Sequence, residues 1–220
     1  MAKDSAGVQV EEAVRAVRAS SRRRQVLDAA VVVMQRTGFH QMSMQALADE
    51  AKVSVGLIYK YFGGKEEILL ATIVDILDQF RDRIAPAMDA AGSDPIERLA
   101  AGFHRYVQIV DENLHAVALT YRESRTLDQR GRDTLKELEV TTSAPLRDAL
   151  EDGVEAGLMN DLDVDLMSFD LMMIAHGWSL KHWHFAPKFT AETYAHAQLR
   201  FVLEAIVAPE HRDSYRHLAS

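Results

Sequence analysis

Apolar residues recur every three to four positions along most of the chain, which is the period of a helix with one buried face. The first clear helix is expected from Ser20 or Ser21 to Gly38, because serine favours helix starts and glycine favours helix ends. Its shared apolar face would consist of Val26, Leu27, Ala30, Val33 and Met34. The polar residues 1–20 before it predict a flexible basic N-terminal arm. Long alternating runs of β-branched residues are lacking, so the pattern indicates an all-α protein.

Two short helices are expected directly after this one. Ser43 can cap a helix over residues 44–51, and Ser54 can cap a third helix that ends near Tyr61. The turn between them begins at Lys52. Two short helices joined by a turn of three to four residues are typical of a helix-turn-helix, whose second helix enters the major groove of DNA.

The remaining two-thirds of the chain predicts further helices. Lys65 begins a fourth helix that should end near Ala85, because Pro86 follows. Later helical segments are expected near residues 95–112, 113–124, 128–157, 163–185 and 190–207. Pro145 should kink or split the third of these segments. The total is nine or ten helices.

Charge is distributed unevenly along the chain. Among 220 residues the net charge is -8, but residues 1–65 carry a net +4 and residues 66–220 a net -12. This asymmetry indicates that only the first part meets a polyanion, although chance placement on solvated faces would give the same totals. The absence of cysteine excludes disulfides and thiolate zinc sites. Because no apolar stretch approaches the roughly 18 residues of a membrane span, we expect a cytoplasmic protein that does not enter the membrane.

The third helix has the composition of a DNA reader. Its outward positions would include Val55, Gly56, Tyr59 and Lys60. Tyrosine hydroxyls and lysine ammonium groups suit phosphate oxygens, and a glycine lets the backbone approach the groove. Each tyrosine could instead be a half-buried packing residue.

The segment SMQALADEAKVSVGLIYKYFGGKEEIL resembles the N-terminal signature of TetR-family transcriptional regulators. The matching residues are Ser43, Leu47, Ala48, Ala51, Val53, Ser54, Gly56, Tyr59, Tyr61, Phe62, Lys65 and Glu66. The sequence departs from the signature at Lys52, where the family usually has glycine, and a non-glycine residue is strained there if its φ is positive. Phe62 is expected in the core.

The resemblance implies a regulator, a repressor in the family's usual mode, that binds palindromic double-stranded operator DNA and is released by a small-molecule effector. Together with the helical period, the resemblance predicts these DNA-binding residues: Arg22, Arg23, Ser43, Gln45, Ser54, Val55, Gly56, Tyr59, Lys60, Tyr61 and Lys65. It also implies a helix-turn-helix domain over residues 21–66 and a larger ligand-binding and dimerisation domain over residues 67–220.

Two later stretches resemble the FadR-like branch of the family, which senses acyl-CoA thioesters. They contain Glu123-Ser124-Arg125 and then Trp178, Lys181, Trp183 and Pro187. By this resemblance the expected ligand-binding residues are Tyr121, Arg122, Arg125, Met172, Trp178 and Lys181. An apolar or drug-like effector is the first alternative, and methionines of this kind also form plain core.

A dimer is expected because one small reading head contacts too few base pairs for specificity. The two segments 163–185 and 190–207 would pair across a two-fold axis as a four-helix bundle. The expected interface residues are Leu166, Phe169, Trp183, Leu199, Val202 and Ile206, unless these form the chain's own core. No catalytic constellation, metal site or cofactor motif stands out, so an all-α enzyme or scaffold is the weaker alternative.

Overall fold

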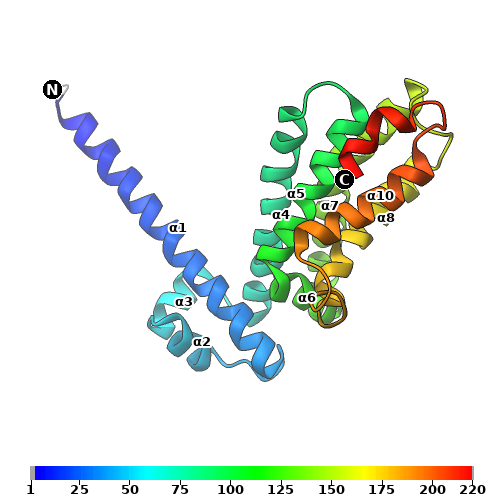
Figure 1. The fold of residues 1–220 in the computed structure, drawn as a ribbon. Coiled ribbons are helices and arrows are strands. Elements are labelled where there is room, and N and C mark those ends of the chain that lie inside the picture. The colour runs from blue at the N-terminus through cyan, green and yellow to red at the C-terminus, as the bar shows by residue number, and fades with distance from the viewer. Residues whose placement is uncertain (1–2, 220) are drawn as a thin grey trace. The chain divides into compact units, whose positions relative to one another are not determined.

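The computed structural model describes residues 3–219 and confirms an all-α chain. Its elements are α1 (Lys3–Thr37), α2 (Met44–Ala51), α3 (Val55–Tyr61), α4 (Lys65–Ala90), α5 (Pro95–Glu112), α6 (Leu114–Glu123), η1 (Ser124–Thr126), α7 (Gln129–Glu155), α8 (Val164–Leu180), α9 (His182–Phe185), α10 (Ala191–Ile206) and η2 (Arg212–Ala219). Figure 1 shows their order along the chain. The contacts separate two compact units, which divide between Thr72 and Ile73 within α4.

The first unit contains the three helices α1, α2 and α3. The apolar face expected on α1 is buried throughout, from Val26 to Met34, and α1 packs against α2. Leu47 and Ala48 of α2 and Ile58 of α3 are also buried. The helix-turn-helix core is therefore built from the residues whose spacing predicted it.

The start of α1 differs from the prediction. The helix begins at Lys3 and runs through Ser20 and Ser21, so a helix start at these serines is wrong. The run EEAVRAVRA contains good helix formers and no proline, and it continues the helix without a break. Residues 1 and 2 of the expected arm lie outside the described residues. The C-terminal end is as expected, since Gly38 has a φ of 78° and its N–H donates to Met34 O.

The second unit is a helical bundle around α5. This helix packs against α7, α8 and α10, and α6 packs against α8. The interior side chains of α5 include Phe103 and Tyr106, both almost fully buried. Asp94 caps α5 by accepting from two backbone N–H groups, and Thr190 forms a capping box with Thr193 at the start of α10. These two starts confirm the predictions made from the sequence.

Two prolines lie inside helices rather than at their ends. α4 continues through Pro86 to Ala90, so its expected end near Ala85 is wrong. Pro86 is exposed, and water can solvate the backbone carbonyl that lacks its usual donor. The chain turns instead at Gly92, whose φ is 98°. Pro145 does not split α7, which is one helix over its full length.

The segment expected as one helix over 163–185 is divided. Lys181 leaves helical geometry with φ -122° and ψ 28°, which ends α8 and separates it from the short α9. Within the described residues, no helix combines the length and the apolarity needed to cross a bilayer.

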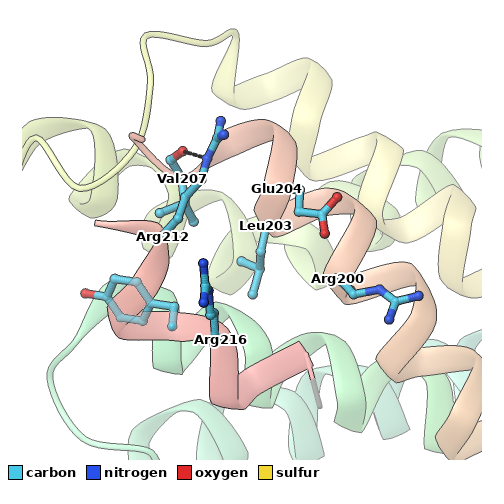
Figure 2. A pocket seen from close by; sticks show the side chains of 7 residues that line it. Arg200, Leu203, Glu204, Val207, Arg212 and Arg216 are labelled. Carbon is cyan, nitrogen blue, oxygen red and sulfur yellow. Dashed lines mark hydrogen bonds between the residues drawn. The ribbon is translucent and has the colours of Figure 1, made fainter. Parts of the chain in front are cut away.

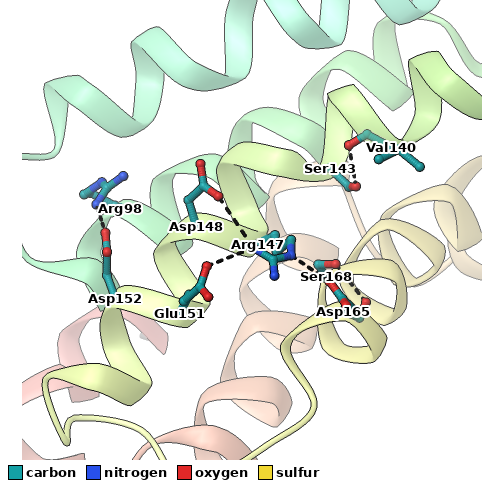
Figure 3. Close-up of polar contacts among 9 residues, drawn as sticks. All are labelled: Arg98, Val140, Ser143, Arg147, Asp148, Glu151, Asp152, Asp165 and Ser168. Atoms are coloured by element: carbon teal, nitrogen blue, oxygen red, sulfur yellow. Dashed lines mark hydrogen bonds and ion pairs between the residues drawn. The ribbon is translucent and has the colours of Figure 1, made fainter.

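Ion pairs connect α7 to both of its neighbours in the bundle (Figure 3). Arg98 of α5 lies 2.7 Å from Asp152, and Arg147 lies 2.6 Å from Asp165 at the start of α8. Arg147 also lies 2.8 Å from Glu151 on its own helix. Exposed pairs of this kind contribute about 0–1 kcal/mol each, so they align helices that apolar burial holds together.

Candidate nucleic-acid interface and effector pocket

The short helix α3 presents a polar and glycine-containing face to solvent. Ser54 caps it, because its Oγ accepts from Leu57 N at 3.2 Å. Ile58 points into the core, which turns Gly56, Tyr59 and Lys60 outward. Tyr59 is 53% exposed, a large value for an aromatic side chain. This face has the chemistry of a surface that contacts the edges of bases and phosphates.

Gly56 is not required by the packing of the chain itself. A Cβ built at this position meets no heavy atom within 4 Å, and its φ is not in the left-handed region. The open space above Gly56 is consistent with close approach by another molecule to the backbone. Val55 beside it is half-buried, so it offers only part of its surface.

The start of α2 contributes exposed polar groups to the same unit. Ser43 caps α2 by accepting from Ala46 N at 3.0 Å. Gln45 is exposed, and its amide donates to Asp49 at 2.8 Å. Any contact of Gln45 with a base therefore has to compete with this intrahelical hydrogen bond.

The aromatic pair at the end of α3 has divided roles. Phe62 is 5% exposed and belongs to the core as expected, whereas Tyr61 is half-buried. The guanidinium of Arg23 lies 5.6 Å from the centre of the Phe62 ring, and Arg22 donates to Gln25. Both arginine side chains are exposed, so each contacts a neighbouring side chain and still presents an outer side to solvent.

Lys65 is a structural contact as well as a surface cation. Its ammonium donates to His40 O at 3.1 Å and lies 5.0 Å from the centre of the Phe39 ring. These contacts connect the start of α4 to the α1–α2 connection, while the side chain stays half-exposed. Its substitution would therefore disturb the first unit, and phosphate binding by this lysine stays a prediction.

Lys52 adopts the conformation that favours glycine. It closes α2 with φ 53° and ψ 45°, and it is the one non-glycine residue with positive φ in the part of the chain that the structure describes. Its turn is closed by a hydrogen bond from Val53 N to Ala48 O at 3.0 Å. The departure from the family signature is thus accommodated by the backbone at a steric cost.

Lys52→Gly is expected to raise the free energy of unfolding by about 0.5–1 kcal/mol, because glycine removes the left-handed strain but adds chain entropy to the unfolded state. Urea unfolding of the full chain, followed by circular dichroism, measures the change. Lys52→Ala is the control, since it removes the charge and keeps the strain. Equal stabilisation by both substitutions would mean that the charge, and not the backbone, is responsible.

The second unit contains a narrow cavity of about 20 Å³, roughly the space of one water molecule. Its lining consists of Ile76, Leu77, Phe80, Val117, Thr120, Tyr121, Glu139 and His176. Of the residues expected to bind ligand, only Tyr121 is among them. Two other polar residues of the lining, Glu139 and His176, were not predicted from the sequence. Glu139 lies in a polar stretch of the sequence and His176 in an apolar one, so neither differs from its surroundings in a way that indicates a site.

Three ring side chains form a hydrogen-bonded chain at this cavity, in which Tyr106 and His176 are buried and Tyr121 is 37% exposed. The Tyr106 hydroxyl lies 3.1 Å from His176 Nε2, and the Tyr121 hydroxyl lies 2.7 Å from His176 Nδ1. Burial lowers the pKa of His176 to about 4, so the imidazole is neutral at pH 7. Burial and the nearby Glu139 carboxylate raise the pKa of Tyr121 to about 12. Tyr121 also directs its hydroxyl at Met173 Sδ, 3.3 Å away.

The other expected ligand residues are not brought together. Met172 and Trp178 are buried, and the Trp178 indole N–H donates to Asp111 at 2.7 Å. Arg122 pairs with Glu123 at 2.8 Å, while Arg125 and Lys181 are exposed. The expectation that these side chains gather around one pocket with Tyr121 is therefore not met by their positions.

Half of the expected dimer residues belong to the core of the chain itself. Leu199, Val202 and Ile206 are at most 3% exposed, so their assignment to a partner surface is wrong. They occupy the side of α10 that packs on α5 and α8. Leu166, Phe169 and Trp183 are exposed as expected. The outward side of α10 instead carries Phe201, which is 68% exposed, and α8 adds Met173.

A larger pocket of about 410 Å³ lies between α10 and η2 (Figure 2). Arg212 Nε donates to Val207 O at 3.2 Å, and Arg216 pairs with Asp213. Figure 2 shows the guanidinium of Arg200 directed away from that of Arg212. The cations therefore do not converge on one point where an anion would sit.

Comparison with known proteins connects both units to one family. Residues 26–72 match the family model "Bacterial regulatory proteins, tetR family", and residues 92–206 match "Tetracyclin repressor-like, C-terminal domain". The chain is 31% identical over 183 residues to the HTH-type transcriptional regulator HbdR of Aromatoleum sp. (strain CIB), which covers 83% of this chain and 80% of that protein.

Two solved structures show the same fold at lower identity. FadR from Bacillus subtilis in complex with stearoyl-CoA has a TM-score of 0.69 and 24% identity, covering 81% of this chain and 96% of that chain. AibR in complex with isovaleryl coenzyme A and operator DNA has a TM-score of 0.70 and 22% identity, covering 82% and 97%. At these identities the likeness extends to the fold alone.

Proposed function

Because the chain belongs to the TetR family of bacterial transcriptional regulators and is not an enzyme, we propose that it represses transcription as a ligand-released dimer on palindromic operator DNA. The observation that carries this proposal is the exposed face of α3, where Gly56, Tyr59 and Lys60 lie above a capped and buried helix-turn-helix core. Rigid support of this kind holds the reading side chains in a fixed register with the groove.

A homodimer is supported by an unpartnered apolar face on α8 and α10. Leu166, Phe169 and Met173 are spaced at three and four residues, so they form one stripe along α8. Phe201 adds a large exposed ring from α10, which contacts α8. Two copies of this face would form a four-helix bundle around a two-fold axis, and the two reading heads would then meet two half-sites.

The proposed effector is an acyl-CoA thioester, with the acyl group seated in the cavity beside Tyr121. FadR and AibR, which share the fold, are solved with stearoyl-CoA and isovaleryl coenzyme A. The apolar lining suits an acyl group, and the exposed cations Arg125 and Lys181 are available to the phosphates of coenzyme A. Since the cavity has room for about one water molecule, the effector must enlarge it, and it favours the released geometry by binding the enlarged cavity more tightly than the closed one.

Operator binding tests the α3 face directly. On DNA from upstream of the chain's own gene, Tyr59→Ala is expected to lower affinity about tenfold or more, because it removes both ring contact and hydroxyl. Lys60→Ala should weaken binding to all sequences and reduce the slope of log affinity against log salt by about one phosphate contact. Fluorescence anisotropy at several salt concentrations measures both effects.

Two controls separate recognition from folding and from effector release. Tyr59→Phe isolates the hydroxyl, and Val32→Ala changes an exposed apolar residue of α1 in the same unit. Full operator affinity in Tyr59→Ala would remove α3 as the reading helix. The wild-type complex is then titrated with acyl-CoA, where an unchanged affinity at saturation would remove the thioester and leave DNA binding intact.

A further inference from the structure

Glu139 places a carboxylate at the cavity without a hydrogen-bond partner among the described residues. It is half-buried on α7, and no hydrogen bond or ion pair joins it to another residue of the described chain. Desolvation raises its pKa, with no neighbouring cation to oppose the shift. A half-buried carboxylate left in this way loses hydration without compensation, which makes it a group that a ligand can satisfy.

The charge of the cavity restricts what can bind there. No lysine or arginine is among the residues that line it, and His176 is neutral because burial lowers its pKa. An anionic group placed close to Glu139 would be repelled by its carboxylate, and the partly desolvated site would screen this repulsion less than water does. Free carboxylates and phosphates are therefore disfavoured, whereas a thioester carries its acyl group without charge.

The exchangeable protons of the neighbouring tyrosine and histidine side chains indicate which ligand group would complement Glu139. Tyr106, His176 and neutral Tyr121 hold three exchangeable protons but share only two hydrogen bonds. When the imidazole donates from Nδ1 to Tyr121, the Tyr121 proton is directed at Met173 Sδ, which is a weak acceptor. The Tyr121 hydroxyl is thus a donor without a strong acceptor. Glu139, which lines the same cavity, is an acceptor without a donor.

We propose that the effector carries a hydroxyl group on its acyl part, and that this hydroxyl donates to Glu139 while it accepts from Tyr121. The inference rests on the proposed function only in taking this cavity as the effector site. One hydroxyl provides both the donor that Glu139 lacks and an acceptor better than the Met173 sulfur. An unbranched methylene group can do neither. The chemical class is therefore a hydroxyacyl thioester, and neither a plain acyl nor a dicarboxylic thioester.

The test uses three coenzyme A thioesters of equal length that differ only in their terminal group. These are ω-hydroxyacyl-CoA, acyl-CoA and ω-carboxyacyl-CoA, each prepared in the butanoyl, hexanoyl and octanoyl series and titrated into the full chain by calorimetry. In the best-fitting series the hydroxyl form is expected to bind about tenfold or more tightly than the methyl form, since a hydrogen bond to a charged group is involved. The carboxyl form should bind weakest.

Substitution of Glu139 assigns the preference to this residue. Glu139→Leu is expected to remove the preference for the hydroxyl form, and Glu139→Gln, which keeps an acceptor of the same shape, should retain part of it. Tyr121→Phe should reduce it as well, and circular dichroism shows whether each variant is folded. Equal wild-type affinity for hydroxyl and methyl forms, or an unchanged preference in folded Glu139→Leu, would overturn the proposal.

A separate pair of probes distinguishes failure of this inference from failure of the thioester proposal. If no thioester binds, 1-hexanol and hexanoate are compared by ligand-observed NMR with wild type and Glu139→Leu. Binding of 1-hexanol that depends on Glu139 supports the hydroxyl site and removes only the thioester. Binding of neither probe, or of hexanoate in preference, overturns the hydroxyl site itself.

Discussion

Phe201→Glu is expected to convert the proposed dimer into monomers and to reduce operator affinity by about 100-fold or more. The two-fold axis would place two glutamates in the apolar interface, and an unpaired buried charge costs several kcal/mol. A monomer presents one reading head, so it loses the second half-site and the specificity that comes with it. Analytical ultracentrifugation measures the mass, and anisotropy on the operator measures the affinity.

Val32→Glu controls for the added charge, because Val32 is also apolar and exposed but lies on α1. This variant should remain a dimer. Phe201→Ala should weaken the dimer less than Phe201→Glu, since it removes contact area without burying a charge. A dimer of undiminished stability in Phe201→Glu would show that the face formed by Leu166, Phe169, Met173 and Phe201 is not where the protomers meet.

The helix-turn-helix could be located from the sequence because its signals are local. Ser43 and Ser54 cap helices through bonds to residues three positions ahead, and Gly38 ends α1 through its own backbone. Each signal therefore depends on a few neighbouring residues. The resemblance to the TetR signature, and not a capping signal, marked Lys52 as a departure from glycine, and its φ is indeed positive.

The proposed dimer face could not be predicted in this way because α10 has two apolar sides. Leu199 and Val202 pack inside the chain, while Phe201, their neighbour in sequence, points outward. Helical period identifies both sides but does not state which one the chain itself covers. That choice depends on contacts with α5 and α8, which are distant in sequence.

The cavity was missed for a related reason. Glu139 lies in the polar stretch KELEVTTS, where a glutamate is normally solvated. The other residues that line the cavity with it come from α4, α6 and α8, and no local sequence pattern predicts that arrangement. His176 has no distinctive spacing in the sequence, although its hydrogen bonds with two tyrosines make it a buried polar centre.

His176 should also make the second unit sensitive to mild acid. Its pKa is about 4 in the folded chain against an ordinary value of 6.5, because burial disfavours the charged imidazolium. Between pH 6.5 and about 4 the unfolded chain therefore binds a proton that the folded chain does not. Stability from this residue is complete above pH 6.5 and falls as the pH decreases, by about 1.4 kcal/mol per unit and by about 3 kcal/mol in total.

Comparison of wild type with His176→Gln isolates this contribution, since the carboxylates of both proteins titrate alike. Glutamine keeps a donor and an acceptor for the two tyrosines but carries no titratable group. Both tryptophans, Trp178 and Trp183, lie in the second unit, so fluorescence during urea unfolding reports on that unit. The difference in unfolding free energy between the two proteins should shrink by about 3 kcal/mol from pH 6.5 to 4. Parallel curves would mean that His176 takes up its proton at the same pH in the folded and unfolded chains, and the desolvated neutral imidazole between Tyr106 and Tyr121 would then be the wrong description of the cavity wall.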